Sequence, residues 1–156
     1  MKIISLYLFL LGVIAIITFG CHKETSLVNN SHLGEPFLIK VNETKLLIPF
    51  VSDKNSSDSI LTLSFKKVIS DGRCPKSICY LCYGSVASIQ VFLTHQKETA
   101  TISLTILGCG TNDDYCYQPK DTLGYRICLL KLDPYPAGNT PINPSNYTAT
   151  LKVSKL

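Results

Sequence analysis

Residues 86–107 read VASIQVFLTHQKETATISLTIL, and this stretch decides the fold class. Apolar and polar residues alternate within each half. The apolar positions are Ala87, Ile89, Val91 and Leu93 in the first half and Ala100, Ile102, Leu104 and Ile106 in the second. A period of two is typical of a strand with one buried face. The polar residues 95–98 join the halves, so the stretch predicts an antiparallel hairpin with one apolar side.

The same alternation recurs along most of the chain. Further strands are predicted at 37–41, 45–51, 60–69, 123–132 and 146–154, and no segment sustains a 3.6-residue period. Strands with one apolar face must bury it, and a second sheet is the simplest partner. We therefore expect an all-β fold, a two-sheet antiparallel β-sandwich that is immunoglobulin-like and carries disulfides, with a small barrel as the alternative.

Two connections between the predicted strands stand out by composition. Residues 71–84 are rich in cysteine, and residues 133–144 contain four prolines. Proline has no N–H to give to a β-ladder, so the second connection is expected to be a stiff segment outside the sheets.

The chain begins with a lysine at position 2 and an apolar run from Ile3 to Phe19, and Cys21 then follows a glycine. A basic start, an apolar stretch and a small residue before the cleavage point are features of an export signal. This arrangement resembles bacterial lipoprotein signals, especially those of the Bacteroidota, which tolerate the Thr and Phe that precede the glycine here. The resemblance implies that residues 1–20 are removed and that the Cys21 thiol carries palmitate or similar acyl chains.

Two other interpretations of this leader stay open. The run is short for a membrane-spanning helix, but an uncleaved signal anchor is one of them. A plain secretory cleavage that leaves Cys21 without lipid is the other. On the lipoprotein interpretation, residues 21–35 are a flexible tether and residues 36–156 form one domain. We expect an exported protein anchored to the cell envelope, at the outer membrane, by its lipidated cysteine.

Charge and motifs exclude several functional classes. The formal net charge is +4 over 156 residues, and no run of five like charges occurs, so nucleic acid is not an expected partner. His22 and His32 lie in the predicted tether and His95 in the predicted turn, which leaves no histidine pair for nucleophilic catalysis. No phosphate-binding loop, G-x-S-x-G or H-E-x-x-H motif is present. We therefore expect neither a catalytic site nor a cofactor.

The number of cysteines supports the lipoprotein interpretation. The sequence has seven, so lipidation of Cys21 leaves an even number. The remaining six are Cys74, Cys79, Cys82, Cys109, Cys116 and Cys128. An even count in an oxidising compartment predicts up to three disulfides.

Spacing alone leaves the pairing of these cysteines open. Cys109 and Cys116 flank a loop of Gly, Asn and Asp residues that a bond between them could close. Cys74 could pair with either cysteine of the C-x-x-C segment 79–82, which would leave the other thiol to reach Cys128. Each of these bonds would restrict the unfolded chain and so stabilise the domain.

The C-x-x-C segment has a second interpretation. Thiolates of Cys74, Cys79, Cys82 and Cys109 are a ligand set that zinc accepts, and C-x-x-C also occurs in redox proteins. A redox motif needs a helix N-terminus in a βαβ unit to lower the thiol pKa, whereas this segment lies between predicted strands. Structural disulfides are therefore favoured. The acidic residues 112–114 could contribute to a calcium site, but such a loop is more often a turn, and no metal site is expected.

Tyrosines gather near the cysteines. Tyr80 and Tyr83 lie in the cysteine-rich connection, and Tyr115 and Tyr117 flank Cys116. Amphipathic rings on bridged, rigid loops are typical of binding surfaces, so these four residues are candidates for one. The alternative is that the rings simply cover the sheets and the disulfides.

Five short segments follow one another along the chain: Asp71-Gly-Arg73-Cys74-Pro75, Gly84-Ser-Val-Ala87, Gly124-Tyr125, Pro134-Tyr135-Pro136 and Tyr147-Thr-Ala149-Thr-Leu151. Their order resembles that in a group of uncharacterised exported Bacteroidota-type lipoproteins. That group has Ser in place of Gly72 and one cysteine in place of Cys79 and Cys82, so its disulfide cannot be mapped onto this chain. The resemblance implies an exported, often lipidated β domain, and it implies no activity.

The sequence thus predicts a lipid-anchored envelope protein with a non-enzymatic binding or structural ectodomain. Its expected partners are the membrane, through the N-terminal lipid, and a protein or glycan ligand. One alternative is a thiol-redox or metal-binding protein that uses Cys79 and Cys82. Another is a protease inhibitor, because small sandwiches can present stiff loops to an active-site cleft.

Overall fold

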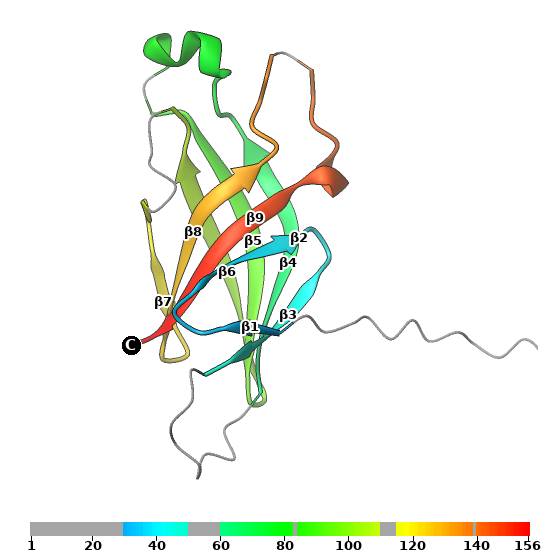
Figure 1. Cartoon of the computed structure of the whole chain (residues 1–156), viewed down its shortest axis with the longest axis vertical. Coiled ribbons are helices and arrows are strands. Elements are labelled where there is room, and N and C mark those ends of the chain that lie inside the picture. The colour runs from blue at the N-terminus through cyan, green and yellow to red at the C-terminus, as the bar shows by residue number, and fades with distance from the viewer. Residues whose placement is uncertain (1–29, 50–59, 83, 110–114, 139) are drawn as a thin grey trace, which may run out of the picture.

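The computed structural model describes residues 30–49, 60–82, 84–109, 115–138 and 140–156. Within these ranges the chain forms two β-sheets (Figure 1). The expected all-β, two-sheet fold with disulfides is confirmed. The predicted signal 1–20, Cys21 and the first part of the predicted tether lie outside the described residues.

The two sheets differ in size and strand order. The five-stranded sheet has the order β1 (Asn30–His32), β3 (Thr44–Ile48), β4 (Leu61–Asp71), β5 (Val86–His95) and β6 (Glu98–Leu107). The four-stranded sheet has the order β2 (Pro36–Lys40), β9 (Thr148–Lys155), β8 (Tyr125–Asp133) and β7 (Lys120–Thr122). Consecutive strands β3 to β6 are neighbours in one sheet, so the immunoglobulin-like arrangement, with its Greek-key connections, is not confirmed.

The hairpin of residues 86–107 forms as its alternation predicts. Val91 is paired with Ile102 across β5 and β6, and both side chains are buried. The turn is tighter than the predicted 95–98, because the strands extend to His95 and Glu98 and leave two residues between them. Gln96 has a φ of 57°, a left-handed conformation that such two-residue turns require.

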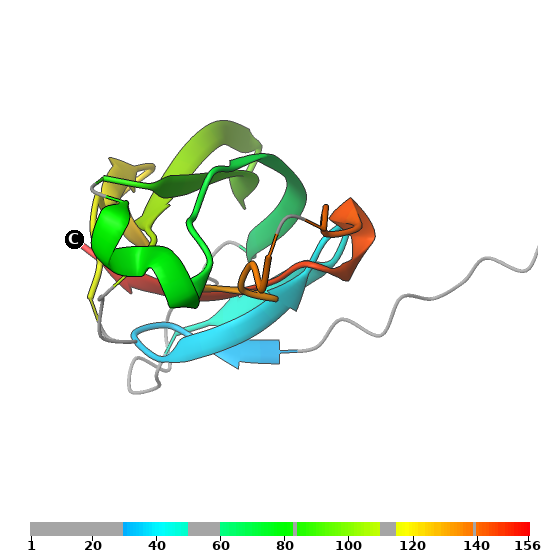
Figure 2. The ribbon, with the colours of Figure 1, turned by 90° about the horizontal axis from the view of Figure 1, so that it is seen from above.

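The two sheets face each other (Figure 2), and apolar side chains from both form one core. Phe65 and Leu104 from the larger sheet and Leu132 and Leu151 from the smaller sheet are all less than 2 % exposed. Burial of apolar area at about 25 cal/mol per Å² is the main stabilising contribution to such a fold. Within the described ranges, no helix has the length and apolar character needed to span a membrane.

The structure corrects the predicted start of the domain. Strand β1 (Asn30–His32) pairs in parallel with β3, and Ser31 is buried. Leu33 packs against the core. The fold therefore includes Asn30, and the last six residues of the predicted tether 21–35 belong to the domain. So short a strand shows no alternation, because its place in the sheet depends on backbone hydrogen bonds.

Two further features were not predicted. Strand β7 is short and mostly exposed, so its sequence carries no apolar alternation. In β8 the ladder to β9 is irregular between Leu129 and Lys131, and as a result both Leu129 and Leu130 are buried. A β-bulge of this kind shifts the alternation by one residue, so that Leu129 and Leu132 both enter the core, whereas Leu130 is buried outside that cluster.

The sandwich has two ends that differ in construction (Figure 1). One end, here called the tip, carries the 3-10 helix η1 (Lys76–Leu81) between β4 and β5 and the connection 134–147 between β8 and β9. That connection includes the short 3-10 helix η2 (Pro144–Asn146). The opposite end carries the β5–β6 turn and the β7–β8 turn at Leu123 and Gly124.

Candidate functional site

All six cysteines after Cys21 form disulfides. The bonds are Cys74–Cys82, Cys79–Cys109 and Cys116–Cys128, with Cα–Cα distances of 6.2, 5.3 and 5.4 Å. These distances lie in the normal range for disulfides. The first two bonds attach η1 to the ends of β4 and β6 at the tip, and the third joins the segment before β7 to β8.

Part of the suggested pairing was wrong. Cys109 is not bonded to Cys116, and Cys128 does not reach the C-x-x-C segment. The reason is the fold: Cys109 follows the end of β6 at the tip, whereas Cys116 precedes β7, which lies beside β8. Cys79 and Cys82 are bonded to different partners and not to each other.

A buried ion pair lies beneath these tip disulfides. The Arg73 guanidinium donates through Nε to Asp71 Oδ1 (2.8 Å) and through Nη2 to Asp71 Oδ2 (2.7 Å). The two side chains are 2 % and 8 % exposed. Arg73 also donates to the backbone oxygens of Leu132 (2.6 Å) and Pro134 (3.1 Å). One arginine therefore fixes the end of β4 to the point where the chain leaves β8.

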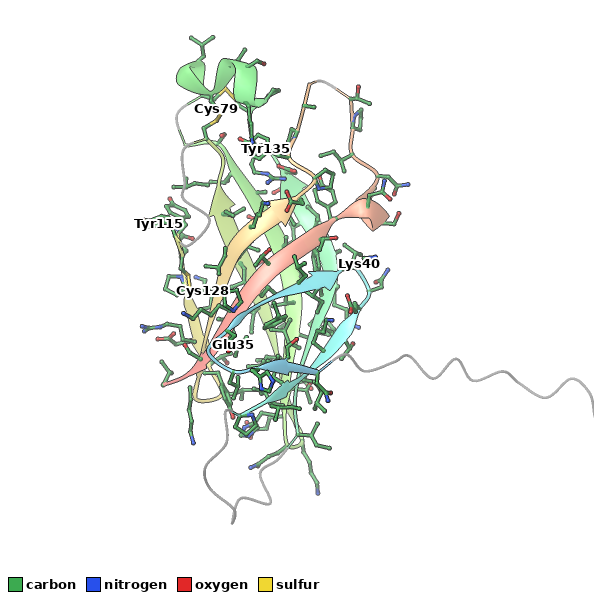
Figure 3. The ribbon with its side chains drawn as sticks, in the orientation of Figure 1. Glu35, Lys40, Cys79, Tyr115, Cys128 and Tyr135 are labelled. Carbon is green, nitrogen blue, oxygen red and sulfur yellow. A yellow bond between two sulfur atoms is a disulfide. The ribbon has the colours of Figure 1, made fainter. Side chains whose placement is uncertain are left out.

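Tyr135 connects the cysteines to the same cluster. Its hydroxyl donates to the Cys74 carbonyl oxygen at 2.9 Å and accepts from the Cys109 N–H at 3.0 Å. The Arg73 Cζ atom lies 4.8 Å from the centre of its ring, a cation–π geometry. Figure 3 shows Tyr135 and Cys79 side by side at the tip. The ring thus bridges both tip disulfides.

The ionisation of Asp71 and Tyr147 reflects this cluster. Burial alone would raise the pKa of Asp71, but the hydrogen bonds and positive charge of Arg73, with the Tyr147 hydroxyl, hold that pKa below its usual value. The pKa of Tyr147 is raised to about 12 by burial and by its hydrogen bond to the negative Asp71 carboxylate. Both shifts favour a charged Asp71 and a neutral Tyr147 at physiological pH.

The close packing at the tip depends on a small residue after β6. A Cβ added to Gly108 would meet Ser85 Oγ at 2.6 Å and Arg73 Cβ at 3.0 Å. The Gly108 N–H also donates to the Ser85 backbone oxygen at 2.7 Å. A larger side chain at this position would push the end of β6 away from Arg73.

A cavity of about 400 Å³ opens beside the cluster, between β6 and β8. Its charged lining residues are Arg73, Lys76, Lys131 and Asp133. Its remaining walls are the side chains of Tyr135, Ile106, Leu107, Leu130 and Leu132 and the Cys79–Cys109 disulfide. Charged groups stand among apolar side chains in this hollow, and its size falls within the range of small-molecule sites.

A second hollow, of about 290 Å³, lies at the opposite end. Its lining includes His95 and Tyr125, whose rings are 5.3 Å apart in an edge-on arrangement. Its other walls are chiefly aliphatic, such as Leu61 and Leu123. We take the tip cavity as the candidate site because a buried guanidinium and a disulfide lie in its walls.

The predicted tyrosine surface is only partly described. Tyr80 lies in η1, and Tyr83 lies outside the described residues. Tyr115 is 51 % exposed, and Tyr117 is half-buried. Figure 3 shows Tyr115 on the side of the sandwich near β7, away from Cys79 and Tyr135. The tyrosine in the cavity wall, Tyr135, was not among the four candidates.

The segments that carried the family resemblance largely converge at the tip. Asp71 and Arg73, Ser85, Tyr135, and Tyr147 come from four of the five segments, and hydrogen bonds link them, including Cys74 N–H to Ser85 Oγ at 3.4 Å. The fifth, Gly124-Tyr125, forms the turn at the opposite end. Four of the five segments therefore each supply one part of a single cluster. The sequence analysis quoted Arg73 and Tyr135 within these segments but did not name them as site residues.

The described residues show no group of three or more His, Cys, Asp or Glu side chains that could hold a metal ion. Comparison with protein-family models, with curated proteins and with solved structures gives no match for this chain. Its function is therefore argued from its own residues.

Proposed function

We propose that this chain is a lipid-anchored binding protein of a bacterial cell envelope, attached through acylated Cys21, with the tip cavity as its ligand site. The proposal joins three parts: export by the apolar leader, anchoring by the cysteine that follows it, and recognition by the cavity between β6 and β8. The outer membrane is the expected location, as in the lipoproteins that the sequence resembles.

One observation carries the anchoring part. The chain has seven cysteines, and six of them are bonded to one another. Cys21 is therefore left without a disulfide partner in its own chain, directly after the leader. Disulfides persist in oxidising compartments, which supports export, and a cysteine outside the disulfides is available for acylation.

The anchor can be tested by mass and by fractionation. The mature wild-type protein should lack residues 1–20, should gain the mass of acyl chains at Cys21 and should lack six thiol hydrogens. Cys21→Ser should release the protein into the soluble fraction or block processing, whereas the neighbouring Lys23→Ser should stay with membranes. A Cys21→Ser protein that remains in membranes with its leader attached would instead establish an uncleaved anchor.

The ligand site can be tested by a fragment screen followed through backbone amide NMR shifts. Compounds that bind should move the amides of Arg73 and Cys109 at the tip and leave those of Gln96 and Gly124 at the opposite end in place. Leu107→Trp narrows the cavity and should weaken the binding of those compounds. Circular dichroism should show that the variant keeps the fold. A screen without binders, or with binders only at the opposite end, would remove the tip cavity as the site.

A further inference from the structure

The charges around the tip cavity do not cancel. Three cationic side chains, those of Arg73, Lys76 and Lys131, and the carboxylate of Asp133 line it. Asp133 is paired with Lys131, with Nζ and Oδ2 at 3.2 Å, and Asp71 is paired with Arg73 from behind. Within the described part of the chain, no carboxylate forms a salt bridge with Lys76. The cavity therefore carries one positive charge in excess at its mouth.

The exposed side chain of Lys76 lies against the Tyr135 ring at the mouth of the cavity. Its Nζ atom lies 5.6 Å from the centre of the Tyr135 ring, the same ring that Arg73 contacts. A cation placed against an aromatic face is attracted by the negative charge of the ring. An ammonium group in this position keeps three N–H donors and a full charge for an incoming group.

Among the described residues, the guanidinium of Arg73 does not use all of its donors. It has five N–H groups. The N–H on Nε and one N–H on Nη2 donate to the Asp71 carboxylate, and the second N–H on Nη2 donates to the Pro134 carbonyl oxygen. One N–H on Nη1 donates to the Leu132 carbonyl oxygen. The second N–H of Nη1 has no acceptor among the described residues. A buried, fixed N–H on a cation is a strong site for a charged oxygen acceptor, because a charge-assisted hydrogen bond is about twice as strong as a neutral one.

The rest of the wall is apolar and rigid. Ile106 and Leu130 are buried, and the Cys79–Cys109 disulfide and the Tyr135 ring are fixed by the hydrogen bonds of the tip. Because these groups offer no further charge, they favour a ligand whose body is hydrocarbon. The walls and the two cations together thus fit a molecule with one charged end and one apolar part.

From these contacts we infer that the tip cavity binds a small organic carboxylate with an apolar body. The carboxylate lies between Lys76 and Arg73, and the hydrocarbon part lies against Leu130 and the disulfide. This inference rests on the proposed function and adds the chemical class of the ligand.

The test compares three probes of nearly equal shape: benzoate, benzamide and benzylamine. Each is titrated into the soluble ectodomain without its leader and lipid, after its folding is confirmed by circular dichroism, and the shifts of backbone amides are followed by NMR. Benzoate should move the amides at Arg73 and Cys109 at the lowest concentration, benzamide should bind more weakly, and benzylamine should bind least.

Two variants that each remove one positive charge make the test more specific. Lys76→Gln should weaken the affinity for benzoate by about two- to fivefold, as expected for a partly solvated charge pair. It should leave the affinity for benzamide unchanged. Lys97→Gln lies in the β5–β6 turn at the opposite end and should change neither probe. Both replace exposed side chains, so both variants should fold.

The possible outcomes separate the inference from the function on which it rests. If benzamide or benzylamine binds at the tip as tightly as benzoate, the carboxylate assignment is overturned and the tip remains a binding site. If Lys76→Gln and Lys97→Gln weaken benzoate equally, the assignment is also overturned. If neither these probes nor the fragment screen moves the tip amides, both the ligand class and the binding function are rejected.

Discussion

The tip and the opposite end of the sandwich are held together by different forces. At the tip, long segments leave the ladders, and two disulfides with the buried Arg73–Asp71 pair fix them. At the opposite end, two tight turns among the described residues join β5 to β6 and β7 to β8, and apolar side chains such as Leu61 are buried. Segments without ladder hydrogen bonds need covalent and ionic contacts to adopt one conformation, and these contacts also build the walls of the cavity.

Complete reduction of the disulfides should have the largest effect and should act mainly on the tip. Loss of a native disulfide from a small domain costs about 2–5 kcal/mol, so the melting temperature should fall by about 10 °C or more. Hydrogen exchange should then accelerate at Arg73 and Cys109 before it does so at Val91. An unchanged melting curve after full reduction, checked by thiol titration, would contradict this account of the tip.

The second prediction compares two arginines with the same geometry. Arg126 binds Asp121 through Nε at 2.8 Å and Nη2 at 2.7 Å, as Arg73 binds Asp71, but that pair is exposed. Arg73→Met should cost about 3–5 kcal/mol in urea unfolding, because it leaves the buried Asp71 carboxylate without a positive charge beside it. Arg126→Met should leave the unfolding midpoint unchanged. Similar losses for both variants would show that burial does not control the strength of the pair.

A third prediction concerns acid. The pKa of Asp71 is lower in the folded state than its ordinary value of 3.8, so its contribution to stability is complete above that value. The contribution is lost as the pH falls through the lower folded pKa, because the folded state then binds the proton. The difference in free energy of unfolding between wild type and Asp71→Asn should therefore shrink as the pH falls below 3.8. A gap of constant size would contradict the role of this ionisation.

A fourth prediction concerns stability at high pH, where Tyr147 of the same cluster loses its proton. Its folded pKa of about 12 lies above the ordinary value of 10.0, so its contribution is complete below pH 10 and is lost as the pH rises to about 12. Tyr147→Phe removes one hydrogen bond and should cost about 1 kcal/mol at neutral pH. The deficit of the variant should narrow above pH 10, and chemical denaturation at several pH values would show whether it does.

The smallest expected effect on stability is at the opposite end, and it is a gain where the earlier variants give a loss. Gln96 has a φ of 57° at the β5–β6 turn, where glycine avoids the cost of a left-handed conformation. Gln96→Gly should raise the stability by about 0.5 kcal/mol, seen as a small increase in melting temperature. Destabilisation by this change would mean that the Gln96 side chain contributes more than the strain that it imposes.

The sequence predicted the fold wherever one face of a strand is buried. The alternation in 86–107 identified β5 and β6 because every second side chain must enter the core. It missed β1 and β7, since three-residue strands are held by backbone bonds that any side chain permits. The even number of cysteines predicted three disulfides, but their pairing depends on which strand ends meet in space.

The candidate site was harder to predict than the fold. Proximity to cysteines selected Tyr80, Tyr83, Tyr115 and Tyr117, whereas Tyr135 reaches the tip from a connection distant in sequence. Hydrogen bonds between residues 61 positions apart, such as Tyr135 to Cys74, leave no local pattern. The ordered set of short segments contained the residues of the tip cluster, but only the fold shows that four of these segments meet around Arg73.

The position of β1 has a consequence for how the molecule faces its surroundings. Figure 1 places β1 towards the end remote from η1, and the eight residues 22–29 separate it from Cys21. Fully extended, a segment of this length reaches only about 30 Å, which is comparable with the roughly 33 Å length of a ten-residue strand such as β5. If Cys21 is acylated, as we propose, residues 22–29 would therefore keep β1 within about 30 Å of the membrane surface.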